Sequence, residues 1–216
     1  MENQGIFVTA CFLKASADWR QYRNMHTLEG VSLREGTVDD VPVLLRLMDI
    51  ATEWLVAEGR PGQWGTEKHS GRQDRMEMMT GLARSGGMWL AVDDNRKEAE
   101  ASAASTDEST RGVIGAICVI EEPVPYVKPA SEPELYIRFL ISDRSSGRRG
   151  VGTLLMEKAY ELTRAAGVGV LRVDCYAGDD QKLVKWYESQ GFQRLESFVV
   201  KGWPGQVLAQ RVEARA

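Results

Sequence analysis

A glycine-rich turn is the first segment whose residue types and spacing could perform chemistry. It reads GRRGVG (147–152) and follows the apolar run LYIRFLIS (135–142), with an amphipathic segment after it. The first backbone N–H groups of a helix have no partner within the helix, and the helix dipole places partial positive charge there. Because Gly150 and Gly152 lack a Cβ, an anion can approach these N–H groups closely. The segment therefore predicts a cradle for a phosphate group, and its two arginines add positive charge beside it.

Other glycine motifs of nucleotide-binding proteins do not fit this spacing. A P-loop requires G-x-x-x-x-G-K-[ST], and no lysine follows the turn at that spacing. A dinucleotide fingerprint requires G-x-G-x-x-G in an early strand–turn–helix unit, whereas this turn falls late in the chain. A glycine-rich corner that binds no ligand remains the structural alternative, because such corners are common.

A tyrosine about 35 residues after the turn is the second candidate for chemistry. Tyr187 occurs in WYESQGF (186–192), where a short amphipathic segment meets a Gly-Phe corner. Taken alone, it is more typical of an aromatic side chain that packs on a sheet, like its neighbour Trp186. Its position before the Gly-Phe corner, taken together with the glycine turn, favours a functional role over simple packing.

These two segments resemble the GCN5-related N-acetyltransferase (GNAT) superfamily. RFLISDRSSGRRGVGTLL (138–155) is similar to the acyl-CoA motif of that family, Q/R-x-x-G-x-G/A, and LVKWYESQGF (183–192) to its terminal helix and following corner. In the order of its elements the resemblance extends from about Val31 to Val212. One departure is Gly147, which stands where the family has Gln or Arg.

The resemblance implies a function and a set of site residues. The chain would be an N-acetyltransferase that transfers an acetyl group from acetyl-CoA, its co-substrate, to an amine by direct attack in a ternary complex. Tyr187 would protonate the departing thiolate. The turn would hold the pyrophosphate through backbone N–H groups, and the strand before it would offer main-chain groups to the pantetheine amides. The implied cofactor-binding residues are Leu140, Ile141, Arg148, Arg149, Gly150, Val151, Gly152 and Thr153.

The general base has weaker support in the sequence. Glu134 precedes the strand that leads to the turn, and Glu122 ends the strand before it, with Glu132 and Glu121 close to each. Any of these carboxylates could take the proton of the amine, or be a solvated residue at a strand end, and a water relay is a further alternative. We expect Glu134 first and Glu122 second.

Aromatic residues mark where an acceptor amine could bind. Trp54 and Trp64 belong to the first predicted helix and the turn after it, and Tyr126 belongs to the long loop before the cofactor strand. These side chains could line a pocket or pack in the core. The acceptor is a small-molecule or peptide amine that the sequence does not specify further.

The spacing of apolar residues predicts the elements that position these groups. We expect strands over 31–35, 88–94, 112–122, 135–142, 170–176, 192–200 and 207–212. We expect helices from 41 to about 59 and over 66–84, 151–166 and 179–190. This order predicts an α/β (α+β) fold with a mixed, mostly antiparallel sheet of about seven strands and about four flanking helices.

The chain divides into an extension and one predicted domain. Residues 1–30 are expected to be an N-terminal extension, and residues 31–216 a GNAT-like acyltransferase domain. Within it, residues 95–111 lack large apolar side chains and predict a flexible loop.

Composition limits the partners and the compartment. The chain has 216 residues and a net charge of −4, so no overall basic field favours nucleic acid. No apolar stretch reaches the ~18 residues that cross a membrane. Three cysteines without C-x-x-C spacing predict reduced thiols in a cytoplasmic protein, and two isolated histidines predict no metal site. The final strands and the aromatic residues are compatible with a homodimer.

Two other functions remain open on the sequence alone. One is a catalytically silent module that binds acyl-CoA as a sensor and contacts a partner through residues 1–30. The other is a protein that binds a different nucleotide at the same turn.

Overall fold

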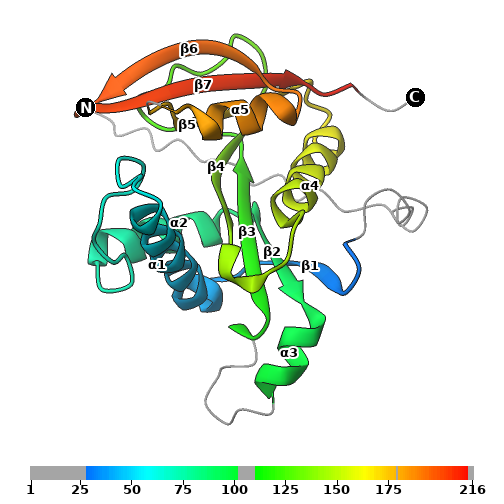
Figure 1. Cartoon of the computed structure of the whole chain (residues 1–216). Coiled ribbons are helices and arrows are strands. Elements are labelled where there is room, and N and C mark those ends of the chain that lie inside the picture. Colours follow the sequence, from blue (N-terminus) through cyan, green and yellow to red (C-terminus); the bar gives the residue numbers. More distant parts are fainter. Residues whose placement is uncertain (1–27, 102–109, 179, 214–216) are drawn as a thin grey trace, which may run out of the picture.

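A seven-stranded sheet in the order β1-β2-β3-β4-β5-β7-β6 organises the computed structural model, which describes residues 28–101, 110–178 and 180–213 (Figure 1). Among the paired strands, only β4 and β5 run parallel. The strands are β1 (Val31–Glu35), β2 (Met88–Asp93), β3 (Val113–Ile120), β4 (Leu135–Ser142), β5 (Val170–Tyr176), β6 (Gln193–Val200) and β7 (Trp203–Arg211). The predicted mostly antiparallel α/β (α+β) sheet is confirmed.

Helices cover both faces of this sheet. In Figure 1, α1 and α2 lie on one side of β3 and β4 and α4 lies on the other, while α5 lies against β5 and β7. The helices of the described residues are α1 (Val41–Ala57), α2 (Gln73–Arg84), α3 (Asp94–Ala101), α4 (Val151–Ala165) and α5 (Lys182–Ser189), with short 3-10 turns η2 (Val38–Asp40) and η4 (Arg144–Ser146).

Two hydrophobic clusters, one on each face, hold the helices to the sheet. Along β3, Ile117 joins the cluster with α4 and α5, whereas Ala116 and Cys118 join the cluster with α1 and α2. Leu155 of α4 and Leu44 of α1 are fully buried in these clusters. Each such leucine contributes about 1.5–3 kcal/mol relative to an exposed position.

The parallel strands β4 and β5 separate partway along their length. They pair only from Leu135 opposite Leu171 to Ile137 opposite Val173. Arg138 is an extra residue in β4 at an irregularity opposite Cys118 and Val119 of β3, and such bulges bend a strand. Beyond this point β4 remains paired with β3 and β5 with β7. The β5-facing edge of residues 138–142 therefore keeps main-chain groups that the sheet does not use.

The helix predicted over 66–84 is shorter than expected. It begins only at Gln73, because residues 61–72 form turns. The carboxylate of Asp49 on α1 accepts hydrogen bonds from the backbone N–H groups of His69 and Ser70, which holds these turns against α1. A contact between segments 20 residues apart is not visible as local periodicity.

A helix also replaces the first part of the flexible loop predicted over 95–111. Residues 94–101 form α3, although they lack large apolar side chains. The Asp93 carboxylate accepts a hydrogen bond from the N–H of Asn95 at the helix start, and Arg96 pairs with Glu100 one turn later. Residues 102–109 of that loop and residues 1–27 of the predicted extension lie outside the described residues.

Among the described residues, no helix is both long and apolar enough to span a bilayer. In the same part of the chain, no group of three His, Cys, Asp or Glu side chains could hold a metal ion.

Candidate active site

The glycine turn links the end of β4 to the start of α4. Gly147 and Gly150 have positive φ angles of 72° and 85°, which glycine adopts without the strain that a side chain would add. Gly147 thus adopts a left-handed conformation that favours glycine, at the position where the family motif has Gln or Arg. No side chain caps α4, whose N-cap is Gly150, so the first N–H groups of the helix remain open to a ligand.

The start of α4 also packs against α5. A Cβ on Gly152 would lie 3.2 Å from Cζ2 of Trp186, so a side chain there would crowd this contact. Val151 beside it is buried in the α4 cluster and fixes the start of the helix. The turn therefore fits a phosphate group: no described side chain caps the first N–H groups of α4, and neither Gly150 nor Gly152 carries a side chain over them.

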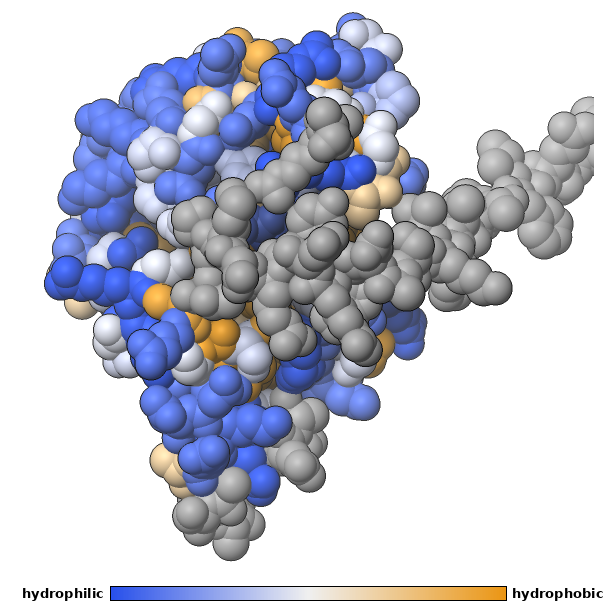
Figure 2. Space-filling model, turned by 90° about the vertical axis from the view of Figure 1, so that its right-hand side faces the viewer, coloured by the Kyte–Doolittle hydropathy of each residue, from blue (hydrophilic) through white to orange (hydrophobic). Residues whose placement is uncertain are grey.

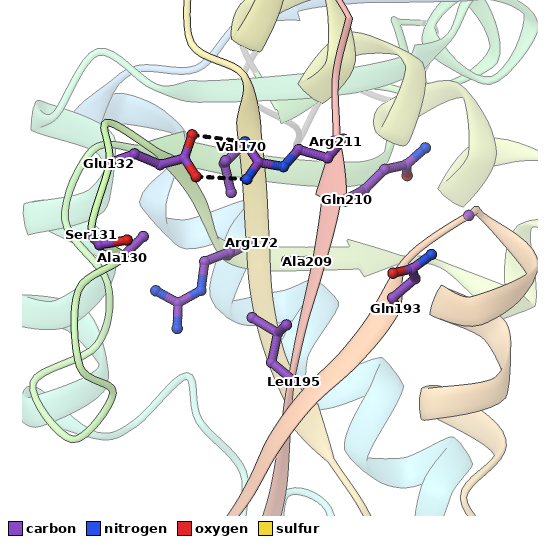
Figure 3. A pocket seen from close by; sticks show the side chains of 11 residues that line it. Ala130, Ser131, Glu132, Val170, Arg172, Gln193, Leu195, Ala209, Gln210 and Arg211 are labelled. Atoms are coloured by element: carbon purple, nitrogen blue, oxygen red, sulfur yellow. Dashed lines mark hydrogen bonds and ion pairs between the residues drawn. The ribbon is translucent and has the colours of Figure 1, made fainter.

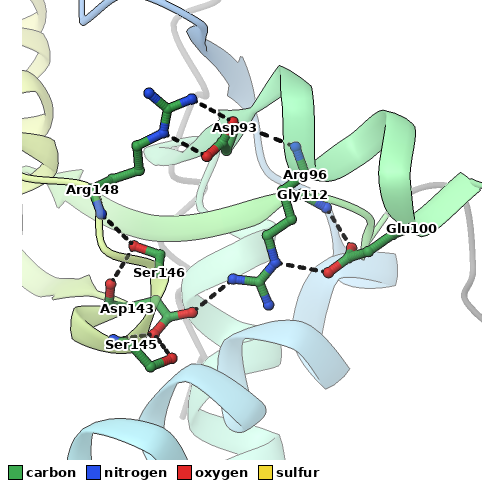
Figure 4. A network of polar contacts seen from close by, with 8 residues as sticks. All are labelled: Asp93, Arg96, Glu100, Gly112, Asp143, Ser145, Ser146 and Arg148. Carbon is green, nitrogen blue, oxygen red and sulfur yellow. Dashed lines mark hydrogen bonds and ion pairs between the residues drawn. The ribbon is translucent and has the colours of Figure 1, made fainter.

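The two arginines of the turn differ in their contacts. Arg148 binds the Asp93 carboxylate through Nε at 2.7 Å and Nη2 at 2.9 Å (Figure 4). This ion pair holds the pKa of Asp93 below its usual value. Arg149 is exposed and makes no ion pair with a described residue. Asp93 thus neutralises the charge of Arg148, whereas the guanidinium of Arg149 is available to an anion.

Tyr187 lies in the hydrophobic cluster beside the separated strands. It is 4% exposed, and its ring lies 4.9 Å from that of Trp186 and 5.6 Å from that of Phe192. Its hydroxyl makes no hydrogen bond with a residue that the structure describes. Burial raises the pKa of Tyr187 well above its usual value, with a smaller effect of Cys175. The hydroxyl is therefore protonated at neutral pH, and its raised pKa makes it a weaker acid than an ordinary tyrosine.

The other face of β5 carries a carboxylate that was not among the predicted site residues. Asp174 follows Val173, the last β5 residue that pairs with β4. Its two oxygens accept hydrogen bonds from the hydroxyls of Tyr136 (2.8 Å) and Tyr126 (3.2 Å). Burial raises the pKa of Asp174, although both hydroxyls and Arg138 limit the rise. The signal in the sequence was one acidic residue inside the apolar, alternating segment VLRVDCY.

The two glutamates expected as bases have other surroundings. Glu134 is 7% exposed just before β4, where it binds Arg172 at 3.0 Å and accepts a hydrogen bond from the N–H of Ala130. Glu122 is exposed after β3, and its backbone oxygen, rather than its carboxylate, accepts a hydrogen bond from Arg138. Of these three carboxylates, Asp174 is the one that lies on β5 directly after the last residue paired with β4.

The aromatic residues expected at the acceptor site lie in two places. The guanidinium carbon of Arg144 lies 4.4 Å from the ring centroid of Trp54 on α1. Trp64 is half-buried in the turn after α1, with its ring edge-on to His69. Tyr126, 47% exposed, lies on the Asp174 side of the sheet. The structure therefore brings Tyr126, but neither tryptophan, into contact with Asp174.

A row of aromatic rings, which the sequence did not reveal, lies on this same side. The rings of Tyr126 and Phe198 are 5.3 Å apart, those of Phe198 and Trp203 6.1 Å, and those of Trp203 and Tyr176 5.6 Å. Trp203 also donates a hydrogen bond to the backbone oxygen of Gln63 at 3.0 Å. This bond connects the turn after α1 to β7 and encloses the row at one end.

A cavity of about 510 Å³ occurs at the beginning of β5, between the loop at 130–132 and strands β6 and β7 (Figure 3). Its charged groups are already paired, since Glu132 binds Arg211 at 2.7 Å and Arg172 binds Glu134. The cavity lies where β4 and β5 are still paired, and neither Tyr187, Asp174 nor the glycine turn lines it. It is not the candidate active site.

Comparison with known proteins agrees with this geometry. The model of the Acetyltransferase (GNAT) family matches residues 53–192, which is more than half of the chain. A search of curated proteins found no match. The chain belongs to the GNAT family of acetyltransferases, whose co-substrate is acetyl-CoA.

Solved structures show the same fold at low sequence identity. A GNAT family acetyltransferase from Listeria monocytogenes has a TM-score of 0.62 and 17% identity, with 87% of this chain and 99% of that chain covered. The PaiA N-acetyltransferase of Thermoplasma acidophilum in complex with coenzyme A has a TM-score of 0.56 and 13% identity, with 84% of this chain and 98% of that chain covered. The putative acetyltransferase YncA of Salmonella typhimurium with acetyl-CoA has a TM-score of 0.55 and 11% identity, with 87% of this chain and 96% of that chain covered.

Proposed function

We propose that this acetyltransferase transfers the acetyl group of acetyl-CoA directly to an amine in a ternary complex. The separation of β4 from β5 after Ile137 and Val173 is the observation that carries the proposal. It leads to the glycine turn at the end of β4, and it has Tyr187 on one face of β5 and Asp174 on the other. A proton donor and a proton acceptor are thus available on opposite sides of one opening in the sheet.

Several residues are suited to hold the co-substrate. The N–H groups at the start of α4 would bind the pyrophosphate, with the Thr153 hydroxyl and Arg149 beside it. The unused edge of β4 at Leu140 and Ile141 would bind the pantetheine arm as an added strand would. Acetyl-CoA supplies a thioester that is already activated, so the protein needs to align the amine and move protons rather than provide a nucleophile.

The proton transfers balance with two side chains. The amine nitrogen forms a bond to the carbonyl carbon, the carbon–sulfur bond breaks, and the amine loses one proton while the sulfur gains one. Asp174 takes the proton of the amine, directly or through water, because its raised pKa makes it a stronger base than an ordinary carboxylate. Tyr187 gives a proton to the sulfur. Asp174 suits this role better than Glu134, which Arg172 holds, or Glu122, which is solvated.

The acceptor is proposed as a small-molecule or peptide amine. Similar folds include an agmatine N-acetyltransferase and the NatC complex bound to a Gag peptide and CoA, so both kinds of acceptor occur on this architecture. An acceptor that enters on the Asp174 side would meet the rings of Tyr126, Phe198 and Trp203. The cytoplasm is proposed as the compartment because Cys118 and Cys175 are free and buried, and a homodimer remains a proposal.

One observation favours the silent acyl-CoA-binding module as a second function. Both oxygens of Asp174 already accept a hydrogen bond from a tyrosine hydroxyl, which stabilises the ionised carboxylate and weakens it as a base. A purified chain that binds CoA but releases no thiol with any amine would support the silent module.

The test is a transfer assay with a panel of cationic, neutral and anionic amines. Free thiol is measured against time, and the acetylated acceptor is identified by mass spectrometry. Turnover in the wild type that falls in both Tyr187→Phe and Asp174→Asn supports the proposal. Turnover that neither substitution changes refutes the assigned roles.

A further inference from the structure

We propose that α3 is a positioning element for acyl-CoA binding, with Arg96 as the residue that holds the pyrophosphate turn in its binding shape. The inference rests on the proposed function, because it concerns the same turn at the start of α4. It assigns a role to a helix between β2 and β3 that the sequence had predicted as loop.

Hydrophobic packing does not account for the position of α3. None of residues 94–100 is buried, and only Arg96 and Glu100 are even half-buried. α3 lies at the bottom of Figure 1, and the described residues at the bottom of Figure 2 are mostly hydrophilic. Polar contacts must therefore hold this helix, and they involve these two side chains.

Arg96 connects α3 to the segment that follows β4. Its Nη1 donates to Oδ2 of Asp143 at 2.9 Å, and its Nε donates to Oε1 of Glu100 at 2.8 Å (Figure 4). The other oxygen of Glu100 accepts a hydrogen bond from the N–H of Gly112 at 2.7 Å, which ties the helix back to the start of β3. Arg96 is thus held from both sides and cannot reorient freely.

Asp143 passes this contact on to the turn. Its side chain accepts a hydrogen bond from the N–H of Ser145 at 2.8 Å, which caps η4. Its backbone oxygen accepts one from the hydroxyl of Ser146, and that hydroxyl accepts one from the N–H of Arg148 at 3.3 Å. The chain of bonds from Arg96 therefore ends at the first arginine of GRRGVG.

A second ion pair, between Arg148 of the turn and Asp93, joins the same two segments. The Arg148 side chain returns to Asp93, and Asp93 also caps the start of α3 through the N–H of Asn95. Arg96 of α3 thus binds Asp143 before the turn, and Arg148 of the turn binds Asp93 at the start of α3. The two ion pairs together link α3 and the end of β2 to the segment between β4 and α4.

The positive charge of Arg96 also compensates the negative charge of Asp143. The Asp143 carboxylate is 2% exposed and lies beside a turn that would bind an anion. Burial opposes its ionisation, but hydrogen bonds from Ser145 and Arg96 outweigh burial and hold its pKa below the usual value. Without Arg96, the buried Asp143 carboxylate would keep only its hydrogen bonds from Ser145, beside a turn that would bind an anion. Glu100 is a second carboxylate on this side, the charge of Arg46 acts on Glu100, and Arg148 is already paired to Asp93. Binding would then favour the protonated form of Asp143.

The experiment compares CoA binding by the full chain and its variants with isothermal titration calorimetry at about pH 6 and about pH 8. Arg96→Met is the test, and Lys97→Met, which removes an exposed charge from the next position of the same helix, is the matched control. We expect the Kd for CoA to rise about tenfold or more in Arg96→Met, within the usual effect of breaking a charged hydrogen bond, and to change little in Lys97→Met. The loss should be smaller at the lower pH.

Two further variants keep the inference testable if Arg96→Met unfolds. Arg96→Lys retains the charge and should bind CoA more tightly than Arg96→Met. The double variant Arg96→Met with Asp143→Asn removes the pair without leaving a buried charge, and it should recover most of the affinity and lose the pH dependence. The rate at saturating acetyl-CoA should stay close to wild type in each folded variant, with the effect confined to KM.

The outcomes separate this inference from the proposed function. If the wild type does not bind CoA, the proposed function fails. If the wild type binds CoA and Arg96→Met binds it equally well at both pH values, the role of α3 is refuted. Equal losses in Arg96→Met and Lys97→Met would also refute it, because they would indicate an effect of net charge alone.

Discussion

Replacement of Gly152 by Asp tests the pyrophosphate cradle directly. A carboxylate at this position would lie within about 5–6 Å of a phosphate charge held by the start of α4, and at an effective dielectric constant of about 20 their repulsion amounts to about 3 kcal/mol. That energy predicts a CoA affinity lower by roughly a hundredfold or more. The helix should survive, because an acidic side chain in the first turn of a helix interacts favourably with its dipole.

Gly152→Asn is the matched control for the added volume. Its side chain has nearly the same shape as Asp and meets the same Trp186 ring, which a Cβ would approach to 3.2 Å. The ratio of the two dissociation constants, measured by calorimetry, therefore isolates the charge. The ratio should shrink at high salt, since the screening length falls from about 10 Å at 0.1 M to about 3 Å at 1 M. Equal affinities of the Asp and Asn variants at low salt would refute the location of the pyrophosphate at this turn.

Three further predictions concern catalysis and stability. Tyr187→Phe should lower kcat by more than about tenfold with little change in CoA affinity, and single-turnover rates together with calorimetry separate the two quantities. Asp174→Asn should lower kcat by about a hundredfold or more, and the rise of wild-type kcat with pH through the raised pKa of Asp174 should disappear from its pH profile. Asp93 and Asp143 have folded-state pKa values below those of the unfolded chain, so they stabilise the fold above about pH 4 and lose this contribution as pH falls through the lower folded values. Urea unfolding from about pH 5 to about pH 2 should show a smaller loss of stability in Asp143→Asn than in the wild type, and an equal loss would contradict the coupling.

The elements with strong local patterns could be predicted from the sequence. The bounds of β4 (135–142) and β5 (170–176) agree with the prediction, because apolar runs between turn residues define them. The glycine turn could also be predicted, because the left-handed φ angles at Gly147 and Gly150 favour glycine. These features depend on residues within a few positions of one another.

The features that were missed depend on residues far apart in the chain. α3 is stabilised through Arg96 and Asp143, which are 47 positions apart, and its own segment carries no apolar stripe. The pKa of Asp174 is raised because folding buries this side chain, and its hydrogen-bond partner Tyr136 is 38 positions away. Local periodicity contains no information about such pairs. The acidic residue within VLRVDCY is visible in the sequence, but the tyrosines that contact it are not.

The alternation of side chains along β5 explains how one short strand serves both halves of the proposed reaction. Val173 and Cys175 face the cluster that contains Tyr187, whereas Asp174 lies between them and faces Tyr136 and Tyr126. Because successive side chains point to opposite faces, a single position of β5 separates the acid side from the base side. The register with β7, in which Asp174 lies opposite Val207, fixes this division. A slip by one residue would place a carboxylate in the hydrophobic cluster, at a cost in desolvation that keeps the register unique.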